Sequence, residues 1–204
     1  EAWDKGLAGT GEVDWTWGSI SRIDLTRPGV AESWTLPDDE TILVHIRKGV
    51  HWALDQKSEA SRLVNGRGFT ADDAVWSLER AYSRPTTYFA LTYPVGERPT
   101  SYKALDKYTL EIKVPKATQG RMVFMTLAFT FLLPHEVAEK YGDFTNWRNL
   151  VGTGPFTLQE VVPGSSLSYV KNPNYWDHDP LYPQNQLPYV DTFRTLILPD
   201  TSTQ

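Results

Sequence analysis

The stretch FTADDAVWSLERA, residues 69–81, carries the clearest structural signal in this chain of 204 residues. The Thr70 hydroxyl is placed to cap the free amide of Asp72 or Asp73, and these two acids complement the positive end of a helix. Apolar residues then recur along one helix face: Ala74, Val75, Leu78 and Tyr82. The pattern ends at Arg84-Pro85, because proline disfavours helical backbone at the preceding residue. The stretch therefore predicts a capped helix with one buried stripe.

Alternating apolar residues predict a strand on each side of this helix. Residues 41–46 place Ile42, Val44 and Ile46 on one face, and the turn-forming sequence PDDE, residues 37–40, precedes them. Residues 108–114 place Leu110, Ile112 and Val114 inward in the same way. Between the first strand and the helix, residues 53–66 are polar and predict a surface excursion that ends at the Asn65-Gly66 turn.

The rest of the chain predicts a series of short elements. Residues 1–29, around Trp15 and Trp17, predict irregular structure. The middle of the chain predicts a helix over 118–127, a strand over 128–133 and a short helix between Pro134 and Gly142. The last part predicts a hairpin of strands 156–161 and 166–170, a loop over 172–188 and a final strand over 192–198. Helices interspersed with separated strands indicate an α+β fold, with mixed β-sheets and flanking helices.

Composition excludes several classes of protein. The chain has no cysteine, which excludes thiol catalysis and disulfide frameworks, and its net charge of −5 without a clustered basic face argues against a nucleic-acid partner. The longest uncharged run, residues 122–133, is too short to cross a bilayer. Aromatic residues make up 13% of the chain, which fits either a ligand platform or a β-rich core.

Segments that resemble enzyme motifs each lack a residue that the motif requires. HEVAE, residues 135–139, resembles a zinc-protease helix, but Glu139 stands where the second histidine is needed. The glycines of residues 152–154 are followed by Pro155, which has no amide proton for a phosphate. The DHD cluster at 177–179 lies in a proline-rich loop and is expected to be solvated, and no G-x-S-x-G motif occurs. We therefore expect a binding protein that is not an enzyme and has no metal or other cofactor.

Four segments, in order over most of the chain, resemble the bacterial extracellular solute-binding protein family 5, the dipeptide, oligopeptide and nickel receptors of ABC importers. The segments are VAESW (30–34) with PDDET (37–41) and IRKGVHW (46–52); NG (65–66) with FTADDAVWSLERA (69–81); VGTGPFTL (151–158) with PG (163–164) and KNPNYW (171–176); and PYVD (188–191) with PD (199–200). Two departures stand out. Residues 53–64 are longer than the family's usual short turn, and the family pattern extends beyond both ends of this sequence.

The resemblance implies part of a type II periplasmic-binding-protein-like fold. Residues 1–204 would be a fragment of its first lobe, with the second lobe absent. Residues of about 30–150 would form an inserted subdomain, and residues 151–204 would return to the first-lobe sheet. Three tryptophans would then have packing roles: Trp34, Trp76 and Trp176.

The resemblance also implies a function. The protein would capture peptides, most typically oligopeptides, outside the membrane and deliver them to ABC permease subunits, acting as a monomeric periplasmic protein or cell-surface lipoprotein. Tyr88 matches a ligand-contacting position after the capped helix, and Tyr93 is a second candidate. A receptor of this kind closes on its ligand because both lobes contact it. We therefore expect residues 1–204 alone to bind peptide weakly or not at all.

One alternative stays open. A carbohydrate-binding or glycoside-hydrolysing extracellular domain could use tryptophan and tyrosine rings as sugar platforms. The positions of the tryptophans distinguish the two hypotheses, because a transport lobe buries most of them and a sugar platform exposes them in a row.

Overall fold

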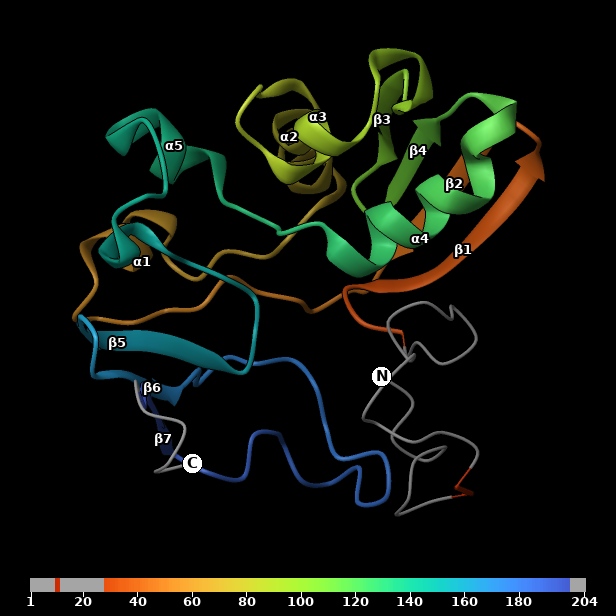
Figure 1. The fold of residues 1–204 in the computed structure, drawn as a ribbon. Helices are drawn as coiled ribbons and strands as arrows, with labels where there is room; N and C mark the ends of the chain where they lie inside the picture. Colours follow the sequence, from red (N-terminus) through yellow and green to blue (C-terminus); the bar gives the residue numbers. More distant parts are fainter. Residues whose placement is uncertain (1–9, 12–27, 199–204) are drawn as a thin grey trace. The chain divides into compact units, whose positions relative to one another are not determined.

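The computed structural model of the protein describes residues 10–11 and 28–198, and the chain divides into two compact units (Figure 1). Unit 1 contains residues 1–48 and 70–131, and unit 2 contains residues 49–69 and 132–204. The irregular structure expected around Trp15 and Trp17 lies outside the described residues. Because this division reflects compactness only, the subdomain expected over about 30–150 stays a prediction.

Unit 1 contains a four-stranded antiparallel sheet with the order β1-β2-β4-β3. The strands are β1 (Ala31–Asp38), β2 (Thr41–Ile46), β3 (Ser101–Asp106) and β4 (Thr109–Lys113). The predicted strands 41–46 and 108–114 are confirmed as β2 and β4, the two inner strands. The sequence did not indicate β1 and β3, because these edge strands are largely exposed and lack a buried apolar alternation.

The core of unit 1 lies on one face of this sheet. Ile42 of β2 is paired with Ile112 of β4, and both side chains are fully buried. Helices α2 (Ala71–Ser83) and α4 (Gln119–Phe129) pack on the sheet, α2 mainly on β3 and α4 on β2. They also meet each other, since the Tyr82 hydroxyl lies 3.4 Å from the Thr126 hydroxyl. The unit is therefore a layer of helices on a sheet, as the α+β prediction requires.

Helix α2 begins as the sequence predicted. Thr70 and Asp73 form a capping box, in which each side chain bonds the other residue's backbone amide; the Thr70 amide donates to the Asp73 carboxylate at 2.9 Å. Asp73 is almost fully buried, whereas Asp72 is exposed. Of the predicted stripe, Ala74, Leu78 and Tyr82 are buried and Val75 is half-buried. The helix ends before Arg84, as expected.

Two predicted elements were wrong. Residues 128–133 do not form a strand: α4 continues to Phe129, and among the described residues no strand pairs with the segment that follows. A continuous apolar run fits a buried helix as well as a strand, and only a pairing partner decides between them. The excursion over 53–66 contains a helix, α1 (Glu59–Val64), whose N-cap is Ser58. Its predicted turn is correct, because Asn65 is left-handed at φ 55°.

Short helices complete unit 1. They are α3 (Tyr88–Thr92) and the 3-10 turns η4 (Val95–Glu97) and η5 (Lys116–Thr118). The sequence did not indicate α3, which is only five residues long.

Unit 2 contains a second antiparallel sheet, with the order β5-β6-β7, and three short helices. The elements are α1, α5 (His135–Tyr141), η6 (Trp147–Asn149), β5 (Phe156–Val162), β6 (Ser166–Lys171) and β7 (Thr192–Leu196). The predicted hairpin, the final strand and the helix between Pro134 and Gly142 are confirmed. Among the residues that the structure describes, no helix is both long enough and apolar enough to span a bilayer.

A half-buried ion pair joins two parts of unit 2. The guanidinium of Arg67, after α1, donates a short hydrogen bond to the Glu136 carboxylate at the start of α5. Burial alone would raise the pKa of Glu136, but the hydrogen bond and the positive charge of Arg67 outweigh it and lower the pKa below its ordinary value of 4.5. The pair therefore stabilises the folded protein only while Glu136 is ionised.

Replacing Asp73 with alanine should destabilise the chain by about 1–2 kcal/mol, because the Thr70 amide loses its acceptor at a buried helix start. Urea unfolding followed by circular dichroism measures this change. Asp72→Ala is the matched control: it removes an exposed acid from the same helix turn and should cost only about 0.3–0.5 kcal/mol. Equal losses for both variants would show that the capping box contributes nothing.

The Glu136→Gln variant should lose about 1 kcal/mol of unfolding free energy at about pH 6. A carboxyl whose pKa is lowered by folding contributes stability above its unfolded pKa and loses it as pH falls through the folded pKa. The difference between the variant and the wild type should therefore shrink once the pH drops below 4.5. Unfolding curves at several pH values test this, with Glu139→Gln on the same helix as control. A difference that does not shrink as the pH falls below 4.5 would contradict the assignment.

Candidate functional site

Tyr88 is the first residue of α3, and its side chain is 61% exposed. Leu91, one helical turn further on, is 74% exposed, and Val95 in η4 is 78% exposed. Residues three apart on a helix share a face, so Tyr88 and Leu91 project together. We call Tyr88, Leu91 and Val95 the α3 ridge. Exposed apolar side chains gathered in this way are typical of surfaces that bind a ligand or a partner.

Tyr93, the second predicted contact, lies behind the ridge. Its side chain is only 8% exposed, its ring stacks on Phe89 with centroids 6.4 Å apart, and the Arg121 guanidinium lies 5.1 Å from the ring centre. Burial raises the pKa of the Tyr93 phenol. The structure therefore places Tyr88 on the surface and Tyr93 within the packing that supports it.

Arg98 holds the ridge in place. Its guanidinium donates to three backbone carbonyls, those of Tyr93 at 2.6 Å, Ala90 at 2.7 Å and Tyr82 at 3.0 Å. These carbonyls belong to α2, to α3 and to the residue that follows α3, so one side chain links the three segments. No sequence pattern marked Arg98, because its acceptors are backbone atoms whose positions only the fold defines. Leu91 could have been found from its helical spacing to Tyr88.

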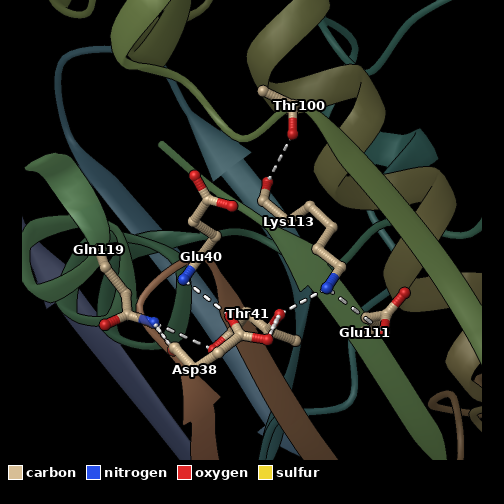
Figure 2. A network of polar contacts seen from close by, with 7 residues as sticks. All are labelled: Asp38, Glu40, Thr41, Thr100, Glu111, Lys113 and Gln119. Atoms are coloured by element: carbon tan, nitrogen blue, oxygen red, sulfur yellow. Dashed lines mark hydrogen bonds and ion pairs between the residues drawn. The ribbon is translucent and has the colours of Figure 1, made fainter. Parts of the chain in front are cut away.

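The β1–β2 turn carries a network of polar contacts (Figure 2). The Asp38 carboxylate accepts from the Glu40 amide and the Thr41 hydroxyl, both at 2.8 Å, and the Thr41 bond contributes most to lowering the Asp38 pKa. Lys113 donates to the Thr41 hydroxyl at 2.5 Å, and the Gln119 amide donates to the carbonyls of Asp38 and Thr41. The network ties the turn to β4 and α4, so these contacts help to hold the fold together.

The asparagines of the KNPNYW segment also have structural roles. Asn172 is fully buried; its amide nitrogen donates to the Gly154 carbonyl at 2.8 Å and its backbone amide donates to the Pro155 carbonyl at 2.8 Å. Asn174 donates to the Trp52 carbonyl at 2.8 Å and accepts from the Leu54 amide. The glycines of residues 152–154 thus form a turn into β5, and the hydrogen bonds of Asn172 stabilise this turn.

Other predicted chemical groups are engaged elsewhere. Glu136 of the HEVAE segment pairs with Arg67, and Asp179 accepts from two backbone amides and from the Tyr189 hydroxyl. Within residues 10–11 and 28–198, no group of three or more histidine, cysteine or acidic side chains is placed to hold a metal ion.

The tryptophans that the structure describes are not arranged as a platform. Trp52 is fully buried and packs against Phe69 in unit 2, with ring centres 5.5 Å apart. The other four described tryptophans are half-buried: Trp34, Trp76, Trp147 and Trp176. A row of exposed indole rings, which a sugar platform needs, does not occur in the described part of the chain.

Comparison with known proteins identifies the same family that the sequence motifs indicate. The sequence profile of bacterial extracellular solute-binding proteins, family 5 middle, matches residues 26–204. The dipeptide-binding protein of Escherichia coli K12 is 28% identical over 189 residues, which cover 86% of this chain and 33% of that protein. The periplasmic oligopeptide-binding protein OppA of the same organism is 26% identical over 167 residues, which cover 74% of this chain and 29% of OppA.

Solved structures agree on the fold. The oligopeptide-binding protein AppA of Bacillus subtilis, in complex with a nonapeptide, superposes with a TM-score of 0.65 at 22% identity, over 86% of this chain and 32% of AppA. The chain thus spans about a third of the length of the relatives that it matches. The expected fold, part of a lobe of a type II periplasmic-binding-protein-like protein, is confirmed. The motifs, the fold and the profile match together show that this chain belongs to the bacterial extracellular solute-binding proteins, family 5.

Proposed function

We propose that this chain is the part of an ABC-importer receptor that supplies one side of a peptide-binding cleft. The observation that carries the proposal is the family match over residues 26–204, joined to relatives that are named for dipeptide and oligopeptide binding. In the family these receptors bind solutes and are not enzymes, which agrees with the engaged state of the candidate chemical groups. The receptor works outside the cytoplasm, as a monomer, and passes its ligand to permease subunits in the membrane.

The α3 ridge supports a role in ligand contact. Apolar side chains that remain exposed on a short helix gain by covering the apolar parts of a bound peptide. Contact through such groups depends little on the exact sequence of the peptide, which suits a receptor for varied oligopeptides. Tyr88 is the contact we propose at the surface, and Tyr93 is retained as a second contact through the 8% of its side chain that stays exposed. Arg98 acts as a positioning residue for both.

Peptide binding is tested by isothermal titration of the natural-length protein, freed of bound ligand, with the pentapeptide Ala-Ala-Leu-Ala-Ala and the dipeptide Ala-Leu. We expect micromolar or tighter binding of the pentapeptide and weaker binding of the dipeptide, and we expect residues 1–204 alone to bind weakly or not at all. Micromolar binding by residues 1–204 would overturn the view that contacts from two lobes are needed. Binding of nickel or of a sugar without peptide binding would overturn the peptide assignment.

Replacing Tyr88 with alanine should weaken binding of the pentapeptide about tenfold, the loss typical of removing one central aromatic contact. Tyr88→Phe keeps the ring and should retain most of the affinity. Tyr182, which is exposed to a similar degree in the loop of unit 2, provides the control: Tyr182→Ala should bind as the wild type does. If Tyr88→Ala and Tyr182→Ala bind equally well, the α3 ridge does not contact the ligand.

A further inference from the structure

Unit 2 contains a cavity of about 430 Å³, and none of its lining residues belongs to the α3 ridge. It is bordered by α1 and the segment before it, by the loop that contains η6, by Tyr141 and by β5. A volume of this size falls within the range of small-molecule sites, about 300–1,000 Å³. Seven lining residues come from 53–61, inside the segment that is longer than the family's usual turn. The segment that we expect to depart from the family pattern therefore forms one part of the cavity wall.

The wall formed by residues 53–61 is held by its own hydrogen bonds. The buried Ser61 hydroxyl donates to the Ala53 carbonyl at 2.6 Å and accepts from the Asp55 amide at 2.8 Å. The Ser58 hydroxyl accepts from the Ser61 amide at 3.1 Å. In the loop that contains η6, the Leu150 amide donates to the Trp147 carbonyl at 3.1 Å. Both walls therefore present their side chains in defined positions.

The acidic groups that line the cavity already have partners. The Asp55 carboxylate accepts from the Lys57 backbone amide at 2.9 Å and, through a short bond, from the Gln159 side chain. The Glu59 carboxylate accepts from Lys140 at 2.5 Å, and this bond lowers the Glu59 pKa below its ordinary value. Glu59 is thus charge-paired, whereas Asp55 keeps its negative charge because both of its hydrogen-bond donors are neutral.

The basic groups that line the cavity have no acidic partner among the described residues. Neither Lys57 nor Arg148 forms an ion pair with any residue in the described part of the chain. The Arg148 guanidinium instead lies 4.4 Å from the ring centre of Trp147, its neighbour in η6. An arginine beside an aromatic face keeps its hydrogen-bond donors available for a carboxylate. With Glu59 paired to Lys140, the two bases outnumber the one remaining acid of the lining, Asp55, so the cavity favours an anion.

The remaining lining adds apolar surface beside these bases. Trp147 is half-buried, and the cavity is also lined by Ala53, Ala60 and Leu158. Small-molecule sites combine apolar walls with a few polar groups that set the orientation of the ligand. We propose that this cavity binds a small organic carboxylate, whose charged group is held by Lys57 and Arg148 and whose apolar or aromatic body lies against Trp147. This site is independent of the proposed peptide cleft.

Benzoate, with benzamide as its uncharged counterpart, tests the proposal on the natural-length protein. We expect titration calorimetry to detect benzoate binding and benzamide to bind at least about tenfold more weakly, because it lacks the charge that the two bases recognise. Lys57→Gln and Arg148→Gln should each lower benzoate affinity about tenfold, and Trp147→Leu should also weaken it. Lys103→Gln, an exposed lysine on β3 of unit 1, is the matched control and should bind benzoate as the wild type does.

Several results would overturn the assignment. They are no detectable benzoate binding, equal affinity for benzoate and benzamide, or unchanged affinity in both charge variants. Titration with Ala-Ala-Leu-Ala-Ala is carried out on the same variants to separate the two sites. We expect Lys57→Gln and Arg148→Gln to leave pentapeptide binding unchanged. A joint loss of benzoate and pentapeptide binding would show that the cavity is not an independent site.

Discussion

The pairing of β2 with β4 is the contact on which unit 1 depends. Ile42 and Ile112 face each other across the two strands with no exposed surface, and Val44 and Leu110 form the next buried pair. Each edge strand needs one of these inner strands as its partner, and helix α2 covers the sheet on β3 and β4. Because Arg98 binds a carbonyl of Tyr82 in α2, the position of the α3 ridge follows in turn from this buried sheet face.

The segments that mark the family serve mainly to build the fold. Asp38 and Thr41 close the β1–β2 turn, Thr70 and Asp73 begin α2, and Asn172 fastens the turn into β5. The side chains of such residues form hydrogen bonds with backbone amides and carbonyls, and this requirement limits which residue types can stand at these positions. A family can therefore be identified from residues that build its fold, which is why the motifs pointed to the receptor class more clearly than to its ligand.

Two surfaces of the chain have features of a ligand site, and they differ in chemistry. The α3 ridge of unit 1 is apolar and open, which suits varied peptide side chains. The cavity of unit 2 has a mixed polar and apolar lining and carries two bases that form no ion pair with the described residues. The first follows the capped helix α2, and the second is lined in part by residues 53–61. The ligand of the cavity is therefore a separate question from the peptide preference of the receptor.

The local pattern of the sequence determined the inner strands of the first sheet, the start of α2, the hairpin of the second sheet and the family. The alternation in residues 41–46 and 108–114, the cap at Thr70 and the hairpin around Pro163-Gly164 all act between neighbours in the chain, so they could be predicted. Residues 128–133 could not, because an apolar run becomes a strand only if another strand pairs with it. Only the tertiary structure exposed Tyr88 and buried Tyr93, gave Arg98 its three carbonyls, and placed Lys57 and Arg148 on one cavity. These outcomes depend on contacts between residues far apart in the sequence, and no local pattern records them.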